Sequence, residues 1–126
     1  MTFLPEKDCL YLENRNLNFE EIVEGDRVGI ILRQFNLPIG SFDVASADVL
    51  IFLPKGYPDI PPDMFHLIPW VKLASRLNYP RCADQSVTFK GLSWQRWSRH
   101  NSDWRVGIDG INTMIKRIEH ALEVAT

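Results

Sequence analysis

A cluster of prolines in the middle of the chain constrains the fold more than any other feature of the sequence. Five of the eight prolines lie between Pro54 and Pro69. Because proline fixes φ and has no N–H to donate, this segment cannot form a helix interior or a central strand. It directly follows the apolar run ADVLIFL over Ala47–Leu53, which is typical of a buried strand. Together these features predict a strand that ends in a stiff, extended connection.

Four short strands are predicted in quick succession. They are expected over Phe19–Val23, Val28–Phe35, Ala47–Leu53 and Met64–Ile68. Glu24-Gly25-Asp26 has the length and composition of a hairpin turn, so the strands predict an antiparallel meander. Val71–Ser93 follows without a clear period and is expected to form a long, partly irregular loop. In a compact domain such a loop is usually functional.

One helix is predicted at each end of this arrangement. The first has Pro5 at its first helical position and ends around Asn14 to Asn16, with Cys9 in the core. The second is expected over Asp103–Val124, where apolar residues recur at helical spacing: Trp104, Ile108, Ile111, Ile115, Ile118 and Leu122. Asp103 is expected to cap this helix, while Gly107 and Gly110 weaken its first turns. The predicted class is α+β with an antiparallel sheet.

Length and composition set further limits. With 126 residues, 45% hydrophobic residues and a net charge of −2, the chain is expected to fold as one domain over 1–126. The weak net charge argues against a protein that binds nucleic acid by neutralising phosphates. No apolar run reaches the roughly 18 residues of a membrane span, and no signal-peptide pattern is visible. Two cysteines outside any CxxC pattern predict a cytoplasmic protein without a metal site.

The segment Tyr57-Pro58-Asp59-Ile60-Pro61-Pro62 resembles a motif of the ubiquitin-conjugating enzyme (UBC-like) superfamily, where it flanks the last strand of a four-stranded meander. Cys82 stands 20 residues past Pro62, at the place where that superfamily carries its catalytic cysteine. Trp97-Ser98 resembles the pair that leads into the helical part. Trp94–His100 is similar to a bacterial branch, the prokaryotic ubiquitin-conjugating-enzyme-like family E, whose members are found beside ubiquitin-like proteins and activating enzymes.

This resemblance implies a UBC-like fold with an N-terminal helix, the meander, a long active-site loop and a C-terminal helix. It also implies a thioester on Cys82, with a ubiquitin-like protein and its activating enzyme as partners. No cofactor is implied, since the activating enzyme consumes the ATP. Tyr57, Pro58, Pro61, Pro62 and Trp97 are expected to be structural. The chain departs from the superfamily where a His-Pro-Asn triplet is expected, because Lys72-Leu73-Ala74 stands there and Asn78-Tyr79-Pro80 is not that motif.

Cys82 and His100 are the residues whose chemistry fits acyl transfer. A thiolate is a strong nucleophile, which Arg81 and Arg76 would favour and Asp84 would oppose. His100 suits the deprotonation of an amine or the stabilisation of an oxyanion. The alternative is that Cys82 fills a gap in a loop and His100 braces that loop against the last helix. The other two histidines, His66 and His120, are weaker candidates.

Four tryptophans are many for a chain of this length: Trp70, Trp94, Trp97 and Trp104. They either pack the long loop onto the last helix or form a partner-binding surface, in which tryptophan and arginine are enriched. For the second interpretation, Trp94, Arg96 and Arg99 are the predicted binding residues. They would present a basic face to an acidic surface of a ubiquitin-like protein.

Three hypotheses for the function follow. In the first, the protein carries a ubiquitin-like polypeptide as a thioester on Cys82 and passes it to an amine with help from His100. In the second, it is a non-catalytic module that binds a ubiquitin-like protein or scaffolds a bacterial conjugation complex, which the missing His-Pro-Asn triplet favours. In the third, it is a thiol hydrolase that uses Cys82, His100 and Asp103. The oligomeric state stays open.

Overall fold

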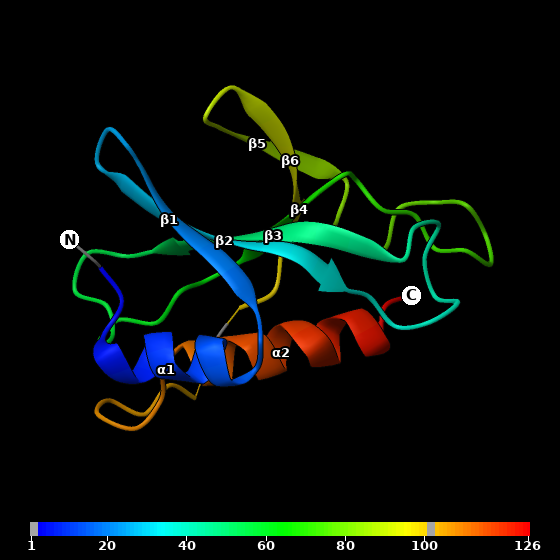
Figure 1. The fold of residues 1–126 in the computed structure, drawn as a ribbon. Coiled ribbons are helices and arrows are strands. Elements are labelled where there is room, and N and C mark those ends of the chain that lie inside the picture. The colour runs from blue at the N-terminus through cyan, green and yellow to red at the C-terminus, as the bar shows by residue number, and fades with distance from the viewer. Residues whose placement is uncertain (1–2, 101–102) are drawn as a thin grey trace.

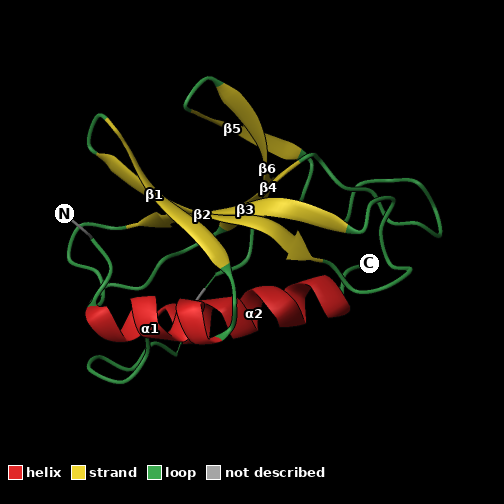
Figure 2. Cartoon of the chain, viewed as in Figure 1, coloured by secondary structure: helices red, strands yellow, loops and turns green. Residues whose placement is uncertain are grey.

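The chain forms one antiparallel sheet with two helices packed against one of its faces (Figure 1, Figure 2). The computed structural model describes residues 3–100 and 103–126. Its elements are α1 (Glu6–Asn14), β1 (Asn18–Glu24), β2 (Arg27–Asn36), β3 (Ser46–Leu53), β4 (Phe65–Ile68), β5 (Gln85–Phe89), β6 (Leu92–Trp97) and α2 (Ile111–Glu123). The sheet order is β1-β2-β3-β4-β6-β5. The α+β class is confirmed, but the described sheet has six strands where four were predicted.

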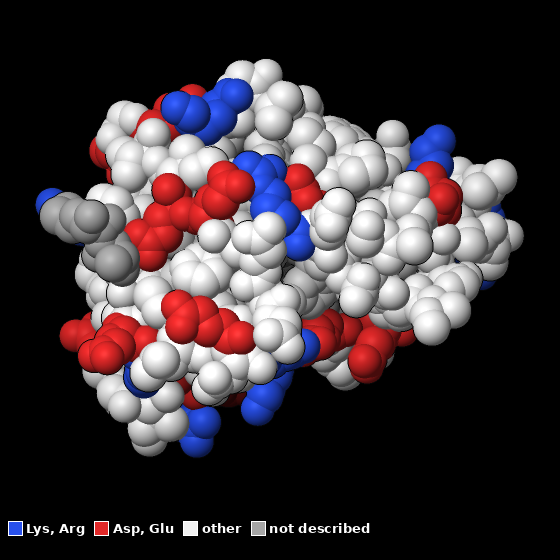
Figure 3. All heavy atoms as spheres, in the orientation of Figure 1, with Lys and Arg blue, Asp and Glu red and all other residues white. Residues whose placement is uncertain are grey.

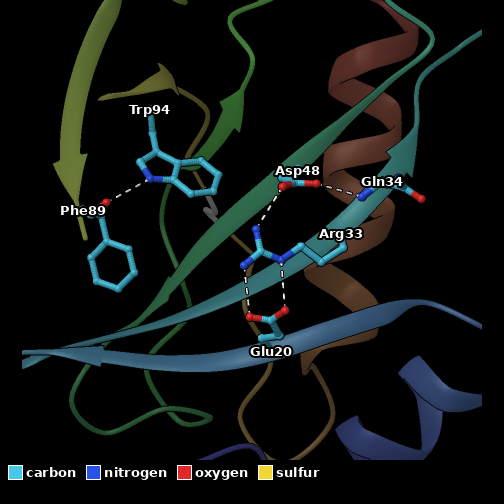
Figure 4. Close-up of polar contacts among 6 residues, drawn as sticks. All are labelled: Glu20, Arg33, Gln34, Asp48, Phe89 and Trp94. Carbon is cyan, nitrogen blue, oxygen red and sulfur yellow. Dashed lines mark hydrogen bonds and ion pairs between the residues drawn. The ribbon is translucent and has the colours of Figure 1, made fainter. Parts of the chain in front are cut away.

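The predicted meander is confirmed in β1 to β4, which pair with one another in sequence order. Its one irregularity, within the ladders of these strands, is a register shift between Leu32 and Phe35 on β2. There Asp48 on β3 accepts hydrogen bonds from Gln34 N at 2.9 Å and from Arg33 Nη1 at 3.0 Å. The same guanidinium pairs with Glu20 on β1 at 3.0 Å (Figure 4). These contacts tie three strands together where the ladder is interrupted.

The prediction of a long irregular loop over Val71–Ser93 was wrong, because this segment contains β5 and the start of β6. The two strands are joined by Lys90 and Gly91, whose φ values of 52° and 75° are those of a tight two-residue hairpin turn. β6 then pairs with β4 and extends the sheet past its predicted edge. The irregular backbone is confined to residues 71–84.

The sheet buries side chains on both faces, since neighbouring residues of β3 belong to different clusters. Val49 and Ile51 pack with residues of both helices in the main core. Leu50 packs on the other side with Phe89 and Trp94 of the β5–β6 hairpin, and Trp94 Nε1 donates to Phe89 O at 3.3 Å (Figure 4). Gly29 allows this approach, because a Cβ there would lie 3.0 Å from the Phe89 ring.

The last helix is shorter than predicted. It starts at Ile111 and not at Asp103, and the residue before it is Gly110. Asp109 explains why the helix starts later. Its carboxylate accepts hydrogen bonds from Arg105 N at 2.7 Å and from the Arg105 guanidinium at 3.0 Å. These bonds fold residues 105–109 into a turn. Gly107 supplies a φ of 81° within this turn.

Two residues assigned to the face of that helix therefore lie outside it. Trp104 is half-buried, and its Nε1 donates to Pro58 O at 2.8 Å. Ile108 is 60% exposed. At the other end of the chain α1 agrees closely with the prediction, except that Pro5 precedes the first helical residue. Cys9 is half-buried at the margin of the main core.

A buried carboxylate joins both helices to the proline-rich segment. Asp8 on α1 is 1% exposed, and it accepts hydrogen bonds from Tyr57 Oη at 2.5 Å and from Ile111 N, at the start of α2, at 3.4 Å. Gly110 leaves room for it, since a Cβ there would lie 2.7 Å from Asp8 Oδ1. Burial and the hydrogen bond to Asp8 raise the pKa of Tyr57. The Tyr57-Pro58 bond is cis, and so is Ile68-Pro69.

Replacing Tyr57 by phenylalanine tests this junction. Tyr57→Phe removes one hydrogen bond to a buried carboxylate, so we expect the free energy of unfolding to fall by about 1–3 kcal/mol in a urea titration. Tyr79→Phe, at a more exposed tyrosine outside the junction, is the matched control and should change it by less than about 0.5 kcal/mol. Equal free energies of unfolding for the two variants would contradict a stabilising role for the hydrogen bond between Tyr57 and Asp8.

Candidate active site

Cys82 lies in an exposed turn directly before β5. Ala83 N donates to Pro80 O at 3.1 Å, which closes the turn. Cys82 itself has a φ of 57°, a left-handed conformation that costs a residue with a Cβ about 1 kcal/mol or more. Asn16, Gln34, Leu77 and Lys90 adopt the same conformation, so it defines the turn at Cys82 without assigning a function to it.

Hydrogen bonds from the backbone and from the Arg99 side chain fix the Cys82 turn against the end of β6. Ser98 N donates to Cys82 O at 3.0 Å, and Arg99 Nη2 donates to Arg81 O at 3.0 Å. Arg81 N in turn donates to Thr126 O at 2.9 Å. The residue predicted as the nucleophile is therefore held beside the segment that carries His100, although the two are far apart in sequence.

Arg99 is the cation that the structure places near the thiol. Its guanidinium lies 5.1 Å from the centroid of the buried Trp97 ring. Partial burial lowers the pKa of Arg99, whereas the charge of Cys82 raises it and that of Arg81 lowers it. The sequence assigned Arg99 to a partner-binding face and assigned the electrostatic role to Arg81 and Arg76. Only the fold brings Arg99 to Cys82.

His100 is an exposed residue with a carboxylate partner. Its Nδ1 lies 2.7 Å from Asp63 Oδ1, and its Nε2 lies 3.4 Å from Ser98 Oγ. An ionised carboxylate only accepts hydrogen bonds, so Nδ1 carries the proton and Nε2 is the basic nitrogen of the neutral ring. Asp63 follows Pro62 directly, and sequence reasoning missed it because the two residues that form the pair are 37 positions apart.

The arrangement provides the parts of an acyl-transfer site. It holds an exposed thiol, a nearby guanidinium and an imidazole oriented by a carboxylate, which are the groups that nucleophilic catalysis with a general base requires. The carboxylate comes from the proline-rich segment, at Asp63, and not from the predicted Asp103. His100 and Asp63 also line a cavity of about 620 Å³, whose wall does not include Cys82.

The other predicted site residues have structural positions. Trp97 is buried in the main core, where its ring stacks on Phe65 with centroids 5.2 Å apart. Trp94 was a candidate for a partner-binding face, but it is 1% exposed and its ring packs in the second cluster, so it offers no surface to a partner. Arg96 is half-buried. Pro58, Pro61 and Pro62 belong to the segment between β3 and β4 that carries Asp63.

The remaining histidines lie apart from this site. His66 is buried on β4, where its Nδ1 is 3.2 Å from Leu50 O and its ring packs edge-on to Phe52. Burial lowers the pKa of His66 to about 4, and the charges of Arg96 and Arg27 act in the same direction. Among residues 3–100 and 103–126, no group of three or more His, Cys, Asp or Glu side chains is placed to hold a metal ion.

Comparison with known proteins identifies a family over nearly the whole chain. Residues 4–125 match the family model described as prokaryotic E2 family E. No curated protein and no solved structure matches the chain. None of the helices in the described part of the chain has the length and apolar character needed to cross a membrane.

The buried His66 predicts a pH dependence of stability. Its pKa is about 4 in the folded chain against 6.5 for an ordinary histidine, so the unfolded chain binds more protons between these values. As the pH falls from 6.5 to 4, we expect the contribution of His66 to lower the free energy of unfolding by on the order of 3 kcal/mol. Urea unfolding at a series of pH values measures this change.

Two variants isolate this effect. His66→Gln should flatten the profile over that range, whereas His120→Gln, at an exposed histidine, should leave it unchanged. A wild-type slope in His66→Gln would show that other groups cause the pH dependence.

Proposed function

Because the chain belongs to the prokaryotic E2 family E, we propose that it carries a ubiquitin-like polypeptide as a thioester on Cys82 and passes it to an amine. One observation carries the proposal. The Cys82 turn is exposed, and the hydrogen bond from Ser98 N to Cys82 O at 3.0 Å holds it beside the segment that bears His100. A carrier needs this combination, because its sulfur must reach a thioester on another protein and a base must then assist the incoming amine.

Loading of the carrier is a thiol–thioester exchange. The Cys82 thiolate attacks the carbonyl carbon that joins the ubiquitin-like polypeptide to a cysteine of the activating enzyme. A new carbon–sulfur bond forms, the old one breaks, and the activating enzyme's thiolate leaves and takes up the proton that Cys82 has lost to solvent. Because the two thioesters are nearly isoenergetic, positioning supplies most of the acceleration. Arg99 lies close enough to Cys82 for the charges of the two groups to interact.

Discharge of the carrier forms an amide. The amine nitrogen attacks the thioester carbonyl, the carbon–sulfur bond to Cys82 breaks, and the Cys82 thiolate is regenerated. His100 Nε2 takes the proton that the nitrogen loses. Asp63 is a positioning residue in this step, since it fixes the ring through Nδ1 at 2.7 Å and stabilises the imidazolium that forms. No cofactor takes part, because the activating enzyme consumes the ATP. The reaction requires reduced thiols, so the proposal includes a cytoplasmic location.

A non-catalytic binding module is the second candidate. The observation that favours it is the segment that replaces the superfamily's His-Pro-Asn triplet. Leu73 N donates to Asn78 O at 2.8 Å, and Ala74 N donates to Ser41 O at 3.0 Å, so this segment is packed by its backbone. It supplies no asparagine side chain to support an oxyanion. A module would bind a ubiquitin-like protein, or scaffold a conjugation complex, without accepting an acyl group.

Acylation tests whether Cys82 can accept an acyl group, which the first candidate requires. We expect the full-length protein to gain one acyl group from the thiobenzyl ester of N-acetylglycine at neutral pH, about tenfold faster at Cys82 than at the half-buried Cys9. Intact-mass spectrometry measures the adduct, and dithiothreitol should remove it. Cys9→Ser is the matched control and should load normally.

Cys82→Ser gives the decisive comparison. A serine oxygen forms at most an ester, so we expect no adduct that dithiothreitol removes. A wild-type amount of reducible adduct in Cys82→Ser would contradict the assignment. Absence of acylation in the wild-type protein would leave the binding module as the function.

A further inference from the structure

A cavity of about 620 Å³ lies between α2 and the chain that leads from β6 to this helix. This volume is within the range of roughly 300–1,000 Å³ that ligand pockets occupy. Its floor is apolar and includes Phe65, Met114, Ile118 and Ala121, and Ile108 adds an exposed apolar wall. Such a floor favours a ligand with an apolar group to bury.

The charge around this floor is positive. Arg99, Lys116 and Arg117 line the cavity, and among the described residues none of them forms an ion pair with a carboxylate. Of the two acids in the lining, Asp109 is paired with Arg105 at 3.0 Å, and Asp63 accepts a hydrogen bond from His100 at 2.7 Å, so three cations face a single carboxylate without a cationic arginine or lysine partner. The cavity therefore presents unpaired positive charge next to an apolar floor.

Arg117 adds an independent observation. Its Nε is buried and has no hydrogen-bond partner within the described part of the chain. A buried donor without a partner is unfavourable, and a ligand acceptor would relieve this cost. The contrast with the rest of the molecule is clear, since the net charge of the chain is −2 and acidic side chains gather on the face shown in Figure 3, over α1 and β1.

We infer that this cavity binds an acidic peptide segment of a partner protein, with an apolar side chain on the floor and carboxylates at Arg99, Lys116 and Arg117. A free phosphate would satisfy the cations but leave the floor unused. A nucleic acid would have to approach a molecule whose net charge is −2. The inference goes beyond acyl transfer and does not depend on Cys82, which is not part of the lining.

Fluorescence anisotropy tests the inference with the full-length protein. The probe is a short fluorescein-labelled peptide in which glutamate and leucine alternate. Two matched peptides replace glutamate by lysine, or leucine by serine. We expect the first peptide to bind at least about tenfold more tightly than either control, because only it offers both charge and apolar groups.

Two exposed lining residues supply variants that keep the fold intact. Lys116→Glu should weaken binding of the acidic peptide about fivefold to tenfold, and Ile108→Ser should weaken it severalfold. Their matched controls are Lys55→Glu and Ile39→Ser, at exposed positions outside this cavity, which should change binding by less than about twofold.

Each outcome of the binding experiment either supports or overturns the inference. Selective binding of the acidic apolar peptide that is lost in Lys116→Glu and kept in Lys55→Glu supports the inference. Equal binding of the lysine peptide would overturn it, and so would displacement by a single-stranded oligonucleotide or by inorganic phosphate at equal concentration. Wild-type affinity in Lys116→Glu and Ile108→Ser would place the peptide elsewhere on the molecule and overturn it as well.

Discussion

The hydrogen bond between the buried carboxylate of Asp8 and the hydroxyl of Tyr57 is the contact on which the arrangement of this molecule depends. A buried carboxylate must be satisfied by donors, and Asp8 draws them from two distant segments, Tyr57 in the proline-rich connection and Ile111 at the start of α2. Gly110 is required beside it because any side chain would collide with Asp8. One charge therefore determines where α1, α2 and the connection meet.

The candidate active site is built outward from that junction. The proline-rich segment is fixed at Tyr57 and again at Pro58, whose carbonyl accepts from Trp104, and its far end presents Asp63 to His100. From the other direction, the end of β6 holds the Cys82 turn through Ser98. The Cys82 thiol and the His100 imidazole thus lie on separate segments, and hydrogen bonds to Ser98 and Asp63 hold each of them in place. In the proposed mechanism, this division replaces the His-Pro-Asn triplet, which the chain lacks.

The sequence predicted the parts of the fold that periodicity and proline determine. The meander, α1 and the stiff connection follow from local patterns, and the resemblance to the family came from the motif within that connection. The β5–β6 hairpin was missed because β5 is a short edge strand with mostly exposed residues, and its alternation has only two apolar positions, Val87 and Phe89. The start of α2 was placed too early because Trp104 and Ile108 fit a helical period by spacing alone. Asp63 and Arg99 gained their roles only from tertiary contacts between segments far apart in sequence.

In the proposed mechanism, Asp63 orients His100 to assist discharge of Cys82. The most direct measurement is the single-turnover rate at which free lysine discharges the acylated protein near neutral pH, compared between Asp63→Asn and Asp59→Asn, an exposed aspartate on the same segment. The account predicts a rate about tenfold lower in Asp63→Asn, with the Asp59→Asn rate within about twofold of wild type. An unchanged discharge rate in Asp63→Asn would contradict it.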